Sequence, residues 1–214
     1  CPYNCKFCLR DEVNKIYRER NVKKVVDDIE YLIKYFNVRE INICNDTLTV
    51  RKKYITEFCN EILKRKIKVR WQGPTRVDIV DLELLKLMKK AGCHTLRYGV
   101  ESGSQEILDL MDKQTNLEQI RKVFKWTKEA GIEIMAYFMI GYINENKKTM
   151  QQTINFAKEL NPDGAIFAVA TPLPGTELFK MASEKGLVDK NYWIDFTLLK
   201  ENKRIPFLIK DADK

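Results

Sequence analysis

The sequence predicts an α/β fold in which parallel strands form a closed or partly closed barrel. Segments with helical periodicity alternate with short apolar runs typical of strands along most of the 214 residues. This alternation is typical of right-handed βαβ units and a parallel sheet. Two Ala-Gly pairs, at 91–92 and 130–131, mark the same helix-to-strand junction in consecutive units. The length fits one sizeable domain.

Helices and strands are expected in strict alternation between residues 21 and 170. Each expected helix has apolar residues at i, i+3, i+4 and i+7, and each expected strand is a short alternating or β-rich run. The expected helices cover residues 22–36, 55–66, 84–91, 115–127 and 150–160. The expected strands cover residues 40–45, 68–72, 94–101, 132–140 and 164–170.

Local signals set the boundaries of these elements. Asn21 is a suitable N-cap for the first helix, and Thr176 is expected to cap a last helix. The run from Thr115 to Glu118 has the spacing of a capping box, in which Thr115 and Glu118 satisfy each other's backbone N–H groups. Gly73-Pro74 is expected to close the second strand, because such pairs interrupt regular structure.

The composition indicates a soluble globular protein, with 44% apolar and 32% charged residues. No run of about 18 apolar residues is present, so no membrane span is expected. Six cysteines, three of them close together, favour a reducing compartment, and we expect the cytoplasm. The net charge of +8 is compatible with a phosphate-bearing partner such as RNA, and also with lysine-rich solvated helix faces. Since the chain begins at Cys1 without a leader, we expect a fragment of a longer protein.

The most specific motif is the cysteine spacing at the start of the chain. Cys1, Cys5 and Cys8 follow the pattern C-x3-C-x2-C. Three thiolates this close in sequence can ligate one metal centre, and iron–sulfur clusters are held by runs of this kind. An ordinary cluster uses four cysteines, so three leave one iron open to a bound molecule. This arrangement favours catalysis over electron relay.

Two other uses of these thiols are weaker. A closed zinc site needs four ligands, usually with a second Cys or His pair. The only histidine, His94, follows Cys93 without such a pair. A disulfide with a spare thiol does not suit a reducing compartment.

Polar residues are predicted to line the inner face of the barrel. On the strand over 94–101, alternation places Arg97, Gly99 and Glu101 on the inward face. Ligand sites in α/β barrels lie at the carboxyl ends of the strands, and Asp46 follows the first predicted strand. An internal ion pair between Arg97 and Glu101 is the alternative explanation for this charge.

The remaining cysteines are predicted to serve packing. Cys59 falls on the apolar face of a helix and is expected in the core. Cys93, with His94, lies at the amino end of its strand, where barrel residues serve stability. Cys44 faces inward near Asp46, so it either lines the cavity or is packed, and packing is favoured.

With Phe7 before the last cysteine, the cysteine loop resembles the signature of the radical SAM superfamily. The resemblance implies that Cys1, Cys5 and Cys8 bind a 4Fe-4S cluster whose fourth iron is chelated by S-adenosylmethionine (SAM). It further implies that an electron splits SAM into methionine and a 5′-deoxyadenosyl radical, which takes a hydrogen atom from a small-molecule substrate. A reductant such as flavodoxin or ferredoxin would supply the electron.

The resemblance also implies a fold, a partial TIM barrel of the (β/α)6 type that lacks its first strand in this fragment. We therefore expect five strands and an exposed sheet edge. Residues 1–186 are expected to form this core. Residues 187–214, with Tyr192, Trp193 and Phe196, are expected to pack on the core or to begin a further domain.

Further segments resemble the cobalamin-associated and methylthio-transferring radical SAM enzymes. Gly99 to Gly103 resembles their fourth-strand segment, which implies contacts of Glu101 and Ser102 with the ribose or amino acid part of SAM. Asp46 stands where the family binds the SAM amino group. Arg76 is placed for the SAM carboxylate, with a surface salt bridge as the alternative.

The segment over 138–145 resembles the adenine-binding segment of the same group, with Gly141 at its first glycine. Ile143 replaces the proline that is usual there. Pro172 to Thr176 matches the turn that follows the sixth strand of these enzymes.

We therefore expect a radical SAM enzyme, most like the cobalamin-associated methyltransferase or cyclase group, with a cobalamin domain outside this fragment. One alternative is a methylthio-transferring radical SAM enzyme that modifies tRNA. Another is a non-enzymatic nucleic-acid-binding module that is stabilised by a bound metal and uses the basic clusters at 51–53 and 64–66.

Overall fold

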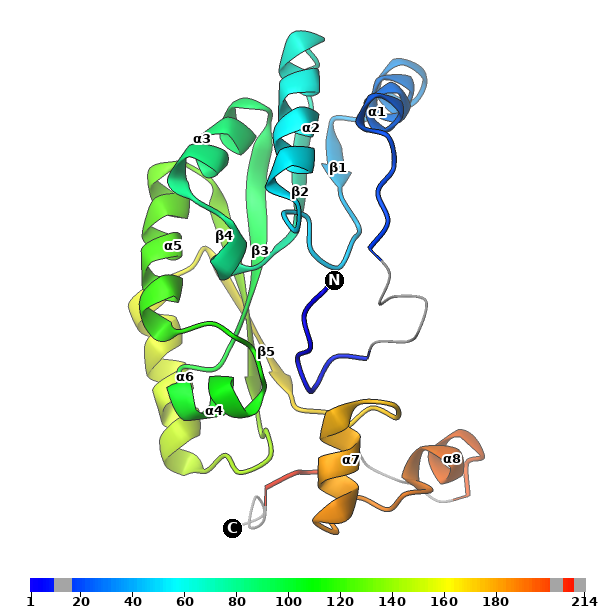
Figure 1. Cartoon of the computed structure of the whole chain (residues 1–214), viewed down its shortest axis with the longest axis vertical. Helices are drawn as coiled ribbons and strands as arrows, with labels where there is room; N and C mark the ends of the chain where they lie inside the picture. Colours follow the sequence, from blue (N-terminus) through cyan, green and yellow to red (C-terminus); the bar gives the residue numbers. More distant parts are fainter. Residues whose placement is uncertain (10–16, 201–205, 210–214) are drawn as a thin grey trace.

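One parallel sheet organises the molecule. The computed structural model describes residues 1–9, 17–200 and 206–209. Within these residues the sheet has five strands in the order β1-β2-β3-β4-β5, and every neighbouring pair is parallel. The strands are β1 (Glu40–Asn42), β2 (Arg70–Thr75), β3 (Cys93–Glu101), β4 (Glu133–Ile140) and β5 (Gly164–Val169). This sequential order confirms the partial TIM barrel, which is an open half-barrel (Figure 1).

Helices connect the strands and cover one face of the sheet. In Figure 1, α3, α5 and α6 lie along that face, and α7 and α8 lie beyond the carboxyl end of β5. None of the helices in the described ranges is both long and apolar enough to cross a membrane. The helices are α1 (Val22–Phe36), α2 (Lys52–Lys64), α3 (Leu82–Lys90), α4 (Gln105–Leu110), α5 (Leu117–Glu129), α6 (Lys147–Leu160), α7 (Glu177–Glu184) and α8 (Tyr192–Thr197), with a short 3-10 turn, η1 (Val77–Ile79).

The main hydrophobic core lies between the sheet and these helices. Leu96, Tyr98 and Val100 alternate along β3, face the helices and are fully buried. Each such large apolar side chain contributes roughly 1.5–3 kcal/mol to folding. Trp71 of β2 is also fully buried, and its indole N–H donates to the carbonyl of Ala91 at 2.8 Å. The predicted inward and outward faces of β3 are therefore confirmed.

A second, smaller core lies at the carboxyl ends of the strands. It joins α4 to α7 and α8 through Met111, Leu178 and Tyr192, and Phe7 of the cysteine loop packs against it. The indole N–H of Trp193 donates to the carbonyl of Pro172 at 2.7 Å. Of the extension predicted over 187–214, residues 201–205 and 210–214 lie outside the described residues.

The second strand ends later than predicted. Gly73 and Pro74 lie inside β2, which continues to Thr75, so the prediction that this pair closes the strand is wrong. The carbonyl of Pro74 accepts from the backbone N–H of Leu48 at 2.8 Å, on the side where β1 has already ended. No ladder donor is missing there, and a proline is tolerated.

The caps of the helices follow the predicted chemistry with one change of register. Asn21 accepts from the backbone N–H of Lys24 at 3.3 Å, and Thr176 accepts from that of Phe179 at 3.1 Å, so both are caps as predicted. The helix that Thr176 caps, α7, is not the last one, because α8 follows it. The capping box of α5, however, is formed by Asn116 and Gln119, so the prediction for Thr115 and Glu118 is wrong. Asn and Gln, one position further on, form the same reciprocal pair of hydrogen bonds.

Candidate functional site

The cysteine loop, residues 1–8, lies at the carboxyl ends of the strands, where barrels place their ligand sites (Figure 1). Two backbone hydrogen bonds fix it between α4 and α7. Lys6 N–H donates to the carbonyl of Met111 at 2.9 Å, and Leu178 N–H donates to the carbonyl of Lys6 at 2.8 Å. A tight turn brings the Cys8 N–H to the carbonyl of Cys5 at 3.0 Å.

Arg76 ties this loop to the sheet from inside the protein. It follows β2 and is only 5% exposed. Its Nη1 donates to Cys5 Sγ at 3.5 Å, its Nη2 donates to the carbonyl of Lys113 at 2.5 Å, and the guanidinium lies over the ring of Tyr3 at 3.6 Å. Its Nε donates to Asp78 at 2.8 Å. The alternative of a surface salt bridge is therefore wrong, because the pair with Asp78 is buried.

The pKa of the Arg76 guanidinium reflects two opposed effects. Burial alone would lower it, but the hydrogen bonds and charge of Asp78 raise it more, so the net shift is upward. Arg76 is therefore a permanent buried cation beside the cysteine loop.

Glu101, at the carboxyl end of β3, pairs with Lys113. The Lys113 ammonium donates to Glu101 Oε1 at 2.9 Å, and the two side chains are 7% and 12% exposed. The alternative of an internal ion pair between Arg97 and Glu101 is wrong, since Arg97 donates to the amide oxygen of Gln72 at 3.2 Å instead. Sequence reasoning missed Lys113, which follows a helix that it did not predict.

The backbone explains why Glu101 turns away from Arg97. Glu101 has a left-handed φ of 69°, at an irregularity in the pairing of β3 with β4. Its carboxylate lies over Gly99, where an added Cβ would be 2.3 Å from Glu101 Oε1 and 2.9 Å from Lys113 Nζ. Gly99 is therefore a glycine because this ion pair occupies the space of a side chain. The Lys113 ammonium also lies 5.8 Å from the ring of Phe7.

Ser102 fastens the end of β3 to α6. It is fully buried, its hydroxyl lies 3.2 Å from that of Thr153, and it accepts from the N–H of Ser104 at 3.1 Å. A Cβ on the neighbouring Gly103 would lie 2.6 Å from the carbonyl oxygen of Gln152, so a glycine is required at this close approach. The polar atoms of Ser102 are thus used within the fold.

The loop after β4 contains two buried polar atoms without a partner. Gly141 has a φ of 79°, and the next N–H, that of Tyr142, donates to Glu145 Oε2 at 2.9 Å. Glu145 Oε1 and the hydroxyl of Tyr142 are buried and accept or donate no hydrogen bond within the described part of the chain. Burial raises the pKa of the Glu145 carboxyl above its ordinary value. Tyr142 lies within the segment over 138–145, but the resemblance assigned it no role.

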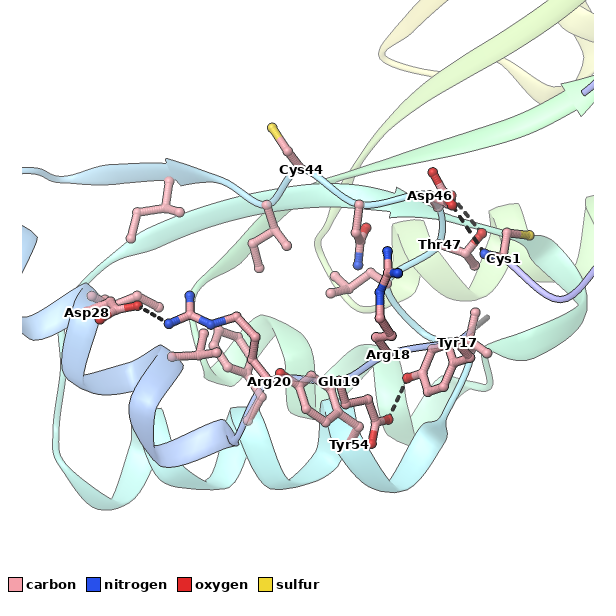
Figure 2. Close-up of a pocket in the computed structure, with 18 of the residues that line it drawn as sticks. Cys1, Tyr17, Arg18, Glu19, Arg20, Asp28, Cys44, Asp46, Thr47 and Tyr54 are labelled. Atoms are coloured by element: carbon pink, nitrogen blue, oxygen red, sulfur yellow. Dashed lines mark hydrogen bonds and ion pairs between the residues drawn. The ribbon is translucent and has the colours of Figure 1, made fainter. Parts of the chain in front are cut away.

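Asp46 lies on the rim of a cavity of about 710 Å³ between α1, β1 and α2 (Figure 2). Its carboxylate binds the α-ammonium group of Cys1 at 3.2 Å. Among the residues predicted for the site, only Cys1 and Asp46 border this cavity, which Val25, Ile29 and Phe58 line with apolar groups.

Cys59 and Cys93 are buried as predicted, whereas the prediction that Cys44 is packed is wrong. Cys44 is exposed, and Figure 2 shows its sulfur pointing away from the other labelled side chains. The reason is that β1 ends at Asn42, so no regular strand continues past this residue to cover it.

The three loop cysteines are of the type that ligates iron–sulfur clusters, but their side chains are not grouped closely enough in the structure to hold one metal ion. In the described part of the chain, no three His, Cys, Asp or Glu side chains are grouped so that they could hold one metal ion. Cys1, Cys5 and Cys8 are all free of disulfides, the first two are partly buried, and Arg76 already contacts one of their sulfurs. Three free thiols on one loop at this end of the sheet fit a cysteine-ligated cluster, around which they would have to converge.

Comparison with protein families identifies the class. Residues 1–157 match the radical SAM superfamily. The chain therefore belongs to the radical SAM superfamily. The cofactors expected from the resemblance, a 4Fe-4S cluster and SAM, are those of this superfamily.

Among individual proteins, the chain is 38% identical over 187 residues to an anaerobic magnesium-protoporphyrin IX monomethyl ester cyclase of Rubrivivax gelatinosus, covering 86% of the chain and 34% of the relative. It is 32% identical over 200 residues to an uncharacterized methyltransferase of Pyrococcus horikoshii, covering 93% and 44%. The chain thus spans less than half the length of these relatives.

Two solved structures share the fold. The cobalamin- and cluster-bound radical SAM methyltransferase TsrM from Kitasatospora setae matches with a TM-score of 0.77 at 19% identity, over 88% of this chain and 38% of that one. OxsB, a cobalamin-dependent SAM radical enzyme, matches with a TM-score of 0.75 at 21% identity, over 86% and 34%.

Proposed function

We propose that this chain is the core of a radical SAM enzyme that reductively cleaves SAM and uses the resulting 5′-deoxyadenosyl radical on a small molecule, in methyl transfer or a related modification. The observation that carries the proposal is the C-x3-C-x2-C loop at the carboxyl ends of a parallel half-barrel, with Cys5 against Arg76. When bound, the cluster and SAM supply the electron transfer and the radical.

The residues of the chain hold and orient these groups. Cys1, Cys5 and Cys8 would ligate the cluster. Asp46, in the segment after β1, would bind the α-ammonium group of SAM. Phe7, packed on the second core, would fix the loop that carries the ligands.

The other predicted residues form the walls of the site. Gly141 would let SAM approach the backbone. Gly99 would leave room for Glu101, which Lys113 holds and which would face the ribose or amino acid part of SAM. The polar groups of Arg76 and Ser102 bind other groups of the protein, so we propose that these two residues support the site indirectly, by positioning its other residues.

The relatives guide the proposal for the whole protein. TsrM and OxsB bind cobalamin, and the first of them is a methyltransferase. We propose a cobalamin-binding domain outside this chain, a flavodoxin or ferredoxin as reductant, and a cytoplasmic location. Residues 1–186 would form the core, with residues 187–214 packed on it through contacts such as Trp193 with Pro172.

Binding of nucleic acid is less well supported. Arg51 pairs with Glu19, Lys52 with Asp81, and Arg65 with Asp27, Glu30 and Glu61. Carboxylates thus neutralise much of the two basic clusters that an RNA backbone would need.

Anaerobic reconstitution tests the proposed function. The chain is incubated with iron and sulfide, its iron content and absorbance are measured, and 5′-deoxyadenosine is quantified after addition of SAM and dithionite. We expect a brown protein that forms 5′-deoxyadenosine, and loss of both properties in Cys5→Ser. Cys44→Ser is the matched control, because this thiol is exposed and outside the loop. A colourless wild type, or equal iron in Cys5→Ser, would contradict the proposal.

A further inference from the structure

Arg76 is held so that one of its nitrogen atoms faces Cys5. Nε and Nη2 are engaged by Asp78 and by the carbonyl of Lys113, and Tyr3 covers the face of the guanidinium. Nη1 remains for the Cys5 sulfur, at 3.5 Å. Because the other donors are fixed, the guanidinium cannot turn away without breaking several contacts. The fold therefore places a cation in a hydrogen bond with the sulfur of Cys5.

Tyr142 lies in the loop after β4 and belongs to the second core, against which Phe7 of the cysteine loop packs. Its side chain is fully buried, and its hydroxyl has no hydrogen-bond partner among the residues that the structure describes. Burial raises the pKa of the Tyr142 hydroxyl, and the charges of Cys5 and Glu177 raise it further, so both groups act electrostatically on it. Tyr142 also shares the second core with Leu178, whose N–H binds Lys6 in the cysteine loop.

Packing alone does not explain this hydroxyl. A phenylalanine would fill the same space without the penalty of a buried, unpaired donor. A tyrosine hydroxyl is protonated at neutral pH and can donate one hydrogen bond. Buried polar groups without a partner call for an explanation, and an absent ligand is one of them.

We propose that Arg76 and Tyr142 both donate hydrogen bonds to the sulfur of Cys5 when it ligates the cluster, and that this pair of donors sets the reduction potential of the cluster. Hydrogen bonds to the cluster sulfurs are among the factors that tune this potential. They stabilise the more negative, reduced state, so each donor raises the potential. The inference rests on the proposed function, and both residues act as positioning and tuning residues, not as ligands.

The test compares Tyr142→Phe with Tyr98→Phe in the reconstituted chain. Tyr98 is an equally buried tyrosine, but its hydroxyl lies 2.9 Å from that of Thr127 on the helix-facing side of β3. Midpoint potentials are measured by redox titration followed by electron paramagnetic resonance. We expect a more negative potential in Tyr142→Phe, a similar shift in Arg76→Lys, and the wild-type potential in Tyr98→Phe.

The melting temperature of the cluster-free chain is a second, independent measurement. Tyr142→Phe should keep the melting temperature of the wild type, since no hydrogen bond is lost, whereas Tyr98→Phe should lower it. A wild type without iron contradicts the proposed function itself. A Tyr142→Phe variant that takes up iron and keeps the wild-type potential overturns the inference alone. If Arg76→Lys fails to fold, Tyr142→Phe decides the question.

Discussion

The pair of Lys113 and Glu101 shows how a single contact can determine neighbouring residues. The carboxylate turns back over Gly99 to reach the ammonium at 2.9 Å, which leaves no room for a side chain there. The carbonyl of Lys113 also accepts from Arg76, which contacts Cys5. The end of β3 is thus connected to the cysteine loop through two buried cations.

Replacing Lys113 with methionine should leave the Glu101 carboxylate buried and unpaired. Breaking such a pair from one side is expected to lower the free energy of unfolding by about 3–5 kcal/mol. The double variant with Glu101→Gln should lose less, because no buried charge remains. Urea unfolding at neutral pH measures these differences.

The control for this experiment is Lys180→Met. Lys180 pairs with Glu177 at 3.6 Å, but both side chains are at least half exposed. An exposed pair of this kind contributes about 0–1 kcal/mol. The interpretation of the buried pair fails if Lys113→Met costs no more than Lys180→Met.

At the scale of elements, the start of α3 depends on one carboxylate. Asp81 accepts from the backbone N–H of Leu84 at 2.9 Å and pairs with Lys52 of α2. The hydrogen bond from Lys52 lowers the pKa of the Asp81 carboxyl, and the backbone hydrogen bond from Leu84 adds to this against the opposing effect of burial. The same side chain therefore caps one helix and joins it to another.

The lowered pKa fixes the sign of a pH dependence. The carboxylate of Asp81 stabilises the folded state fully above its unfolded pKa, about 3.9, and this contribution is lost as the pH falls through the folded pKa. Asp81→Asn keeps a capping acceptor but loses the charge, so its unfolding free energy should fall less than that of the wild type between pH 5 and pH 3. Asp81→Ala should cost about 1 kcal/mol at pH 7. Urea titrations at several pH values test both, and identical acid profiles for Asp81→Asn and wild type would refute the assignment.

The sequence predicted the long elements well because their periodicity records burial against a single sheet. Helices such as α1 and strands such as β3 are long enough to show that pattern. The six-residue helices α4 and α8 are too short to show it. The end of β2 at Thr75 depended on where the neighbouring strand stops, which no local signal records.

Part of the candidate site could likewise be predicted from the sequence, and part could not. Its cysteines follow from spacing along the chain, so the sequence alone placed them. Lys113 lies near the site only because the fold pairs it with Glu101, and Tyr142 only because it packs in the smaller core beside the cysteine loop. No motif marks Lys113, and the resemblance over 138–145 assigned no role to Tyr142, so only the structure could reveal them.

At the scale of the whole molecule, two cores have different tasks. The larger one lies between the sheet and its helices and holds the half-barrel. The smaller one joins α4, α7 and α8 at the carboxyl ends of the strands, and Phe7 packs against it (Figure 1). The position of the cysteine loop therefore depends mainly on the smaller core.

Two leucines of equal burial can separate these tasks. Leu178 in the smaller core and Leu85 in the larger one are both fully buried, and each Leu→Ala change should cost about 2–5 kcal/mol locally. Hydrogen exchange followed by mass spectrometry should show faster exchange in Leu178→Ala around Lys6 and α7, while β3 and β4 stay protected. Leu85→Ala should accelerate exchange throughout the sheet. If Leu178→Ala opens β3 as readily as α7, the two cores form one cooperative unit and the cysteine loop is fastened by the whole barrel.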